Sequence, residues 1–71
     1  MKVKIIAISK EDGYYKNNRK DLIGKTGTIK EEEYKTEHTG GGWYSGEIIL
    51  DEPPKNLVQN PYFYLVRVKK L

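Results

Sequence analysis

The chain has no cysteine and only one histidine, one tryptophan and one phenylalanine among its 71 residues. Without cysteine it can form neither a disulfide nor a thiolate metal site. With His38 as the only imidazole, a transition-metal site is not expected either. A domain of this length buries only about 60% of the surface that its unfolded chain exposes. Folding must therefore depend on a small apolar core or on a partner.

Long apolar runs are also missing. The longest uncharged apolar run covers residues 5–8, far short of the roughly 20 residues that span a bilayer. The N-terminus has too short an apolar stretch for a signal-peptide core and no small-residue cleavage site. We therefore expect one domain, residues 1–71, in the cytoplasm, with no membrane contact.

Charged residues are abundant but segregated. They make up 32% of the chain, and the net charge is +3. Residues 10–25 and the C-terminal residues 67–70 are basic, whereas residues 31–37 and 47–52 are acidic. This distribution predicts a domain with one basic face and one acidic face.

The apolar pattern predicts four main strands, at residues 2–9, 24–30, 43–51 and 62–69. In the third strand we expect Ile48 and Leu50 on one face, opposite Ile49. Strict alternation in the last strand would put Tyr62, Tyr64, Val66 and Val68 on one face and Phe63, Leu65, Arg67 and Lys69 on the other.

No segment shows an apolar stripe at helical spacing, so residues 10–23 and 31–42 are predicted as connections. Short strands in so small a chain must close on themselves to hide their edges. We expect an all-β, small SH3-like barrel of four to five strands, with an OB-fold as the second choice.

Two glycines lie in the second predicted strand, within the segment Gly24-Lys25-Thr26-Gly27-Thr28-Ile29. A phosphate-binding P-loop would need a glycine at Arg19 and a helix after the motif, and neither is present. The glycines are better explained as backbone devices, which supply a positive φ or a close backbone approach at a turn and a bend. No cofactor is expected.

The same segment resembles the core of the KOW motif, an apolar residue followed by Gly-Lys-x-Gly-x-(Ile/Val). That motif occurs in SH3-like barrels of ribosomal proteins and transcription elongation factors. The match covers residues 22–30. It implies an SH3-like barrel and a role in contacting nucleic acid or a ribonucleoprotein. The acidic residues that follow, Glu31 to Glu33, depart from the KOW pattern, because they would repel a phosphate backbone.

The segment before this motif combines tyrosines with basic residues. Tyrosines can stack on bases, and lysine or arginine can contact phosphates. The alternative is that the tyrosines cover the barrel end and the lysines are solvated. The predicted nucleic-acid or partner contacts, in this loop and beyond it, are Tyr14, Tyr15, Lys16, Arg19, Lys20, Lys25, Tyr44, Arg67 and Lys69.

Trp43 and Tyr44 follow a glycine triplet. We favour Trp43 as a core residue, since large side chains are scarce. The alternative is an exposed aromatic pair that anchors a partner.

No histidine, serine or carboxylate has the spacing of a catalytic group, so no enzyme, no metal and no small-molecule substrate is expected. We expect a non-enzymatic binding module for RNA, DNA or a ribonucleoprotein. The alternative is a protein–protein adaptor, or an accessory subunit of a larger complex, that uses Tyr44, Tyr62 and the acidic strand ends.

Overall fold

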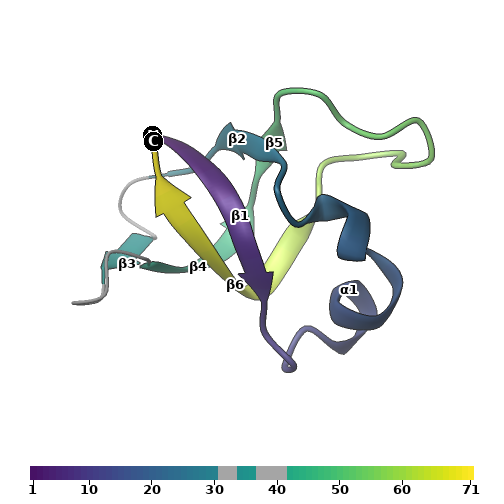
Figure 1. The fold of residues 1–71 in the computed structure, drawn as a ribbon, viewed down its shortest axis with the longest axis horizontal. Coiled ribbons are helices and arrows are strands. Elements are labelled where there is room, and N and C mark those ends of the chain that lie inside the picture. Colours follow the sequence, from purple (N-terminus) through teal and green to yellow (C-terminus); the bar gives the residue numbers. More distant parts are fainter. Residues whose placement is uncertain (31–33, 37–41) are drawn as a thin grey trace.

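A computed structural model describes residues 1–30, 34–36 and 42–71 of the chain. They form one antiparallel sheet of six strands in the order β3-β4-β6-β1-β2-β5 (Figure 1). The strands are β1 (Lys2–Ile8), β2 (Thr26–Thr28), β3 (Tyr34–Thr36), β4 (Gly42–Glu47), β5 (Ile49–Leu50) and β6 (Tyr62–Lys70). The small all-β fold predicted from the sequence is confirmed.

The sheet is strongly curled. Only Ile48 separates β4 from β5, yet β6, β1 and β2 lie between them in the strand order. The far edge of the sheet must therefore return to the end of β4. Gly46 has a φ of +138°, which glycine adopts readily, at this bend. The predicted third strand is thus two strands, with Ile48 and Leu50 buried and Ile49 exposed as expected.

The connection predicted for residues 10–23 was wrong in part. It contains a short helix, α1 (Gly13–Asn18), and a single 3-10 turn, η1 (Lys20–Leu22). Helix α1 has too few residues to show a helical period, which explains why the sequence pattern missed it. Strand β3 likewise lies inside the second predicted connection. Helix α1 and β3 lie at opposite ends of the molecule (Figure 1).

Both glycines of the KOW-like segment act as the sequence predicted. Gly24 has a φ of +96° at the turn after η1. At Gly27, an added Cβ would lie 2.7 Å from the carbonyl oxygen of Ile49 and 2.8 Å from Cγ2 of Ile48. Any side chain there would push β5 off β2, so the glycine permits the close pairing of Gly27 with Leu50.

Strand β6 carries a bulge that the alternating pattern did not anticipate. Tyr44 pairs with Val66 and Gly46 with Phe63, so β6 contains one extra residue at this point. The extra residue reverses the alternation. Phe63, Val66 and Val68 are therefore all buried, while Tyr62 and Tyr64 are exposed, which corrects the predicted faces of this strand.

The Asp12 carboxylate, which is distant from β6 in the sequence, stabilises this bulge by direct hydrogen bonds. Its two oxygens accept hydrogen bonds from the backbone N–H groups of Tyr64, at 2.9 Å, and Leu65. Asp12 is buried, and its backbone carbonyl accepts a hydrogen bond from the N–H of Lys16, which is the first backbone hydrogen bond of α1. One residue thus joins the start of α1 to the bend in β6.

Candidate nucleic-acid interface

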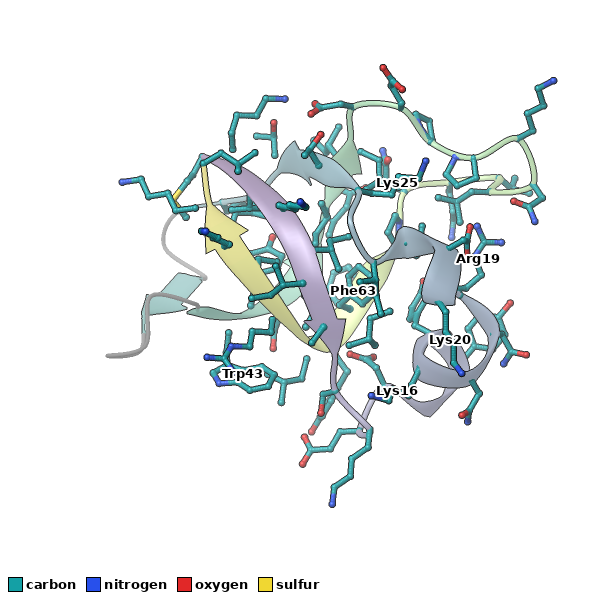
Figure 2. The ribbon with its side chains drawn as sticks, in the orientation of Figure 1. Lys16, Arg19, Lys20, Lys25, Trp43 and Phe63 are labelled. Atoms are coloured by element: carbon teal, nitrogen blue, oxygen red, sulfur yellow. The ribbon has the colours of Figure 1, made fainter. Side chains whose placement is uncertain are left out.

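The basic residues of the predicted loop are exposed on α1 and η1. We use the name α1 surface for Tyr14, Lys16 and Lys20, all of which are exposed. Figure 2 shows Lys16 and Lys20 on the same side of the molecule, away from Trp43. Lys25 is half-buried on the segment between η1 and β2. Lys16 and Lys20 thus lie on one side of the molecule, and Tyr14 is exposed on the same helix as Lys16. Glu31 to Glu33, which would weaken an interface placed beside them, lie outside the described residues.

Two other residues of that loop have structural contacts. The ring of Tyr15 lies 4.7 Å from that of Phe63, and the Tyr14 ring packs edge-on against Tyr15 at 5.4 Å. Nη2 of Arg19 donates to Asp21 at 3.0 Å and to Asn56 at 3.3 Å, and Arg19 is buried. Tyr15 therefore covers the core, and Arg19 ties η1 to the connection between β5 and β6. Much of each side chain is thus engaged within the fold, which leaves less of it for the surface contact predicted from the sequence.

Tyr44 was wrongly predicted as a contact residue. Its side chain is 1% exposed in the core, and its hydroxyl donates to the backbone oxygen of Glu47 at 2.7 Å. Trp43, which we favoured for the core, is half-buried on the outer side of β4. The two residues alternate along a strand, so only one of them can face the core, and that one is Tyr44.

A second basic surface lies on the outer face of the sheet. We call it the basic sheet face and define it as Lys2, Lys4, Trp43, Arg67 and Lys69. The strand register places Lys4 directly opposite Lys69, and Trp43 directly opposite Arg67. The Arg67 guanidinium carbon lies 5.6 Å from the centre of the Trp43 ring. The predicted contacts Arg67 and Lys69 thus belong to this face and are separate from the α1 surface.

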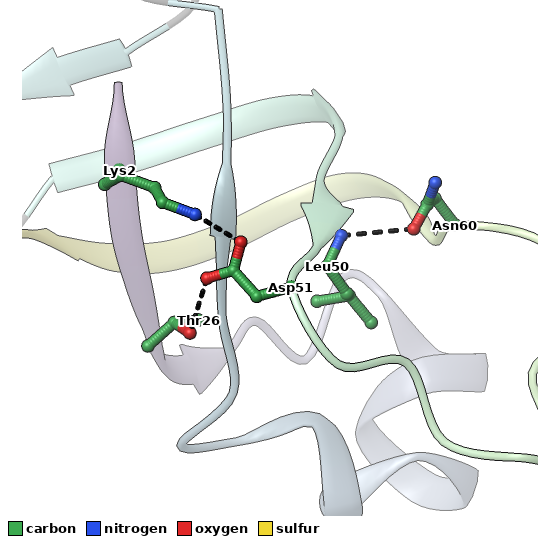
Figure 3. A network of polar contacts seen from close by, with 5 residues as sticks. All are labelled: Lys2, Thr26, Leu50, Asp51 and Asn60. Atoms are coloured by element: carbon green, nitrogen blue, oxygen red, sulfur yellow. Dashed lines mark hydrogen bonds and ion pairs between the residues drawn. The ribbon is translucent and has the colours of Figure 1, made fainter.

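The positive charge of Lys2, at one end of this face, is partly neutralised. Lys2 forms an ion pair with Asp51, whose other oxygen accepts a hydrogen bond from the Thr26 hydroxyl at 2.8 Å (Figure 3). The hydrogen bond from Lys2, and next the one from Thr26, hold the pKa of Asp51 below its ordinary value. Nearby, the side-chain oxygen of Asn60 accepts a hydrogen bond from the Leu50 N–H at 3.1 Å (Figure 3). This bond gives a backbone donor of the edge strand β5 an acceptor.

Lys4 and Lys69 have no such partner. Both are exposed, and the described residues contain no ion pair or side-chain hydrogen bond to either one. Like charges directly opposite each other on a sheet are destabilising. Lysines often protect sheet edges against aggregation, but β1 and β6 are the two central strands of this sheet. Edge protection therefore does not explain the pair.

Comparison with known proteins adds no relative. No protein-family model, curated protein or solved structure matches the chain. Within the described residues no cluster of histidine, cysteine or carboxylate side chains could hold a metal ion. In the same part of the chain, no helix has the length and apolar character needed to cross a membrane.

Lys4 was not among the contacts predicted from the sequence, and Trp43 is half-buried on the outer side of β4 instead of in the core. Residues 4 and 69 are neighbours only through the register of β1 and β6. The signal available in the sequence was the alternation of Lys2 and Lys4 with Val3 and Ile5, which places both lysines on the solvent side of a strand.

Proposed function

We propose that the protein is a non-enzymatic binding module that contacts nucleic acid, with the basic sheet face as its main phosphate-binding surface. The observation that carries the proposal is the opposed pair Lys4 and Lys69 on central strands. Phosphates of a nucleic acid placed over the pair would relieve the repulsion between the two ammonium groups.

The neighbours of the pair support the same ligand. Arg67 and Trp43 continue the face beside Lys69, and guanidinium and indole groups recur where proteins contact phosphates and bases. The exposed Lys16, Lys20 and Tyr14 of the α1 surface offer a second region of contact. The resemblance of residues 22–30 to the KOW motif agrees with this ligand class.

The proposal is tested by fluorescence anisotropy with labelled single-stranded and duplex RNA and DNA. At about 50 mM salt, where phosphate contacts are strongest, binding should be detectable. With about four phosphate contacts on duplex DNA, affinity should fall roughly a hundredfold between about 50 and 200 mM salt. No detectable binding of any of the four ligands at the lower salt would refute the function.

A pair of double variants locates the interface. Lys4→Gln with Lys69→Gln should reduce the slope of log affinity against log salt by about 1.4 to 1.8. Lys10→Gln with Lys55→Gln removes the same charge from two other exposed lysines and should change that slope much less. If Lys16→Gln with Lys20→Gln lowers affinity more than the sheet-face double variant does, the α1 surface is the main interface and the assignment to the sheet is wrong.

A further inference from the structure

A surface of opposite character lies at the other end of β6. We call it the acidic tyrosine surface and define it as Glu11, Glu47, Ile49, Tyr62 and Tyr64. Tyr62 is 71% exposed, Tyr64 69% and Ile49 54%. Tyrosine is enriched where proteins bind partners, and large exposed side chains that gather in one patch mark such sites.

The surface is grooved. One groove of about 360 Å³ runs beside β4 and β5, with Glu47, Ile49 and Tyr62 in its wall. A second groove, of about 420 Å³, is lined by Glu11 and by residues at and beside the β6 bulge, Tyr64 among them. Ser45 and Tyr62 border both grooves, so the two adjoin.

The geometry suits an extended chain. Tyr62 and Tyr64 are two residues apart on one strand and share its solvent side, so their side chains emerge about 6–7 Å apart. An extended peptide presents alternate side chains at the same spacing. The Asp12 carboxylate holds the bulge that turns both tyrosines outward.

The charge of this surface selects the ligand. Glu11 and Glu47 are both exposed, and neither side chain has an ion pair within the described residues. Lys30 also lines the first groove and offsets part of the charge of Glu47 there, whereas Glu11 is the one charged residue, among those that the structure describes, that lines the second groove. Carboxylates beside tyrosine rings attract arginine and lysine side chains, which also bind over aromatic faces, whereas they repel phosphates.

We propose that the acidic tyrosine surface docks an extended, cationic segment of a partner protein. The segment would place arginine or lysine side chains against Tyr62 and Tyr64, with their charges toward Glu47 and Glu11. This proposal does not rest on the nucleic-acid contact, because the acidic tyrosine surface and the basic sheet face share no residue.

The test is a titration of the isotope-labelled protein, followed by the chemical shifts of its backbone amides. The probe is a capped nonapeptide of alternating glycine and arginine, and the control peptide has glutamine in place of arginine. We expect saturable shifts centred on Ser45, Glu47, Tyr62 and Tyr64, with a dissociation constant below about 1 mM. Binding of both peptides with equal affinity, shifts centred elsewhere, or no saturation would overturn the proposal.

Two variants and one control sharpen the result. Tyr62→Ala should weaken the arginine peptide about tenfold, as expected for loss of an aromatic anchor, and Glu47→Gln several-fold. Both side chains are exposed, so the fold should persist, and the amide spectrum verifies this. Lys4→Gln, on the basic sheet face, should leave peptide binding unchanged while it weakens nucleic-acid binding. Unchanged peptide affinity in Tyr62→Ala would refute the proposal.

A second copy of this chain is the competing occupant, since it carries a basic face of its own. Sedimentation of the protein alone, over a range of concentrations, separates the two cases. A monomer supports docking of a different protein. A dimer or filament whose formation Tyr62→Ala abolishes would show that this surface binds a second copy of the chain, and would overturn the proposal.

Discussion

Replacement of Asp12 by alanine should be among the most damaging single changes in this protein. Asp12 is 8% exposed, and its carboxylate accepts the N–H groups of two consecutive residues in the β6 bulge. Those N–H groups lie where the extra residue interrupts the ladder with β4. The carboxylate therefore supplies the acceptors that the neighbouring strand does not.

The magnitude follows from the two hydrogen bonds. A hydrogen bond to a charged group contributes about 1.5–3 kcal/mol, and a buried N–H left without an acceptor costs a similar amount. Water can reach the exposed side at Tyr64, so we take the lower end and expect a loss of about 3 kcal/mol for Asp12→Ala. A domain of 71 residues unfolds with about 4–10 kcal/mol. The variant should therefore lose a third or more of its stability.

Urea unfolding followed by Trp43 fluorescence measures the loss, with an unchanged m-value as the check on two-state behaviour. Glu11→Ala is the matched control, because it removes the same charge from the adjacent, exposed residue. It should change the unfolding free energy by less than about 0.5 kcal/mol. Asp12→Asn keeps one acceptor and should fall between the two. If Asp12→Ala costs no more than Glu11→Ala, the carboxylate does not hold the bulge.

Gly27→Ala should cost about 1–3 kcal/mol in urea unfolding, because its Cβ would meet the backbone of β5. Gly13→Ala, whose Cβ would meet nothing within 4 Å, should be neutral or slightly stabilising; equal effects at the two glycines would contradict the close approach. For Asp51, the folded-state pKa lies below the ordinary 3.8, so its contribution is complete above that value and is lost as the pH falls through the folded pKa. The stability difference between the native protein and Asp51→Asn should therefore be constant above about pH 5 and shrink in acid. A difference that stays constant down to about pH 2 would exclude the ion pair with Lys2 as its source.

The parts of the fold that follow simple periodicity were predictable. The alternation of Val3 and Ile5 with lysines identified β1, and Ile48 and Leu50 were correctly placed inside. The backbone roles of Gly24 and Gly27 were correct because few other functions require glycine at those positions. The alternation and the positive φ of Gly24 depend on near neighbours in the sequence, whereas the close approach at Gly27 involves Ile49.

The bulge in β6 could not be predicted in this way. An extra residue is invisible in the sequence of one strand, because it exists only relative to the partner strand. Its consequence is large, since it moves Tyr62 and Tyr64 to the solvent side while Val66 and Val68 stay inside. The residue that stabilises it, Asp12, lies 52 positions away from Tyr64 in the sequence.

The exposure of the residues in the basic, tyrosine-rich loop also depends on contacts that are distant in the sequence. Composition correctly marked residues 14–20 as basic and aromatic, but a domain this small must also take core and tertiary contacts from such a loop. Tyr15 packs on Phe63 and Arg19 bonds to Asn56, so Lys16, Lys20 and Tyr14 are left at the surface.

The charge of the side chains differs between the two ends of β6. Its C-terminal half carries Arg67 and Lys69 next to Lys4, whereas its N-terminal half carries Tyr62 opposite Glu47. The bend at the bulge lies between the two halves.

A polyanion held at the basic end would be repelled by Glu47 and Glu11 at the other end, and a cationic segment would be repelled by Lys4 and Lys69. If both proposals hold, each surface excludes the ligand of the other, and the protein could hold a nucleic acid and a basic partner at once without competition between them. A titration of the arginine peptide into the preformed nucleic-acid complex decides this: binding to the protein without release of the nucleic acid is expected, and displacement would show that both ligands use one surface.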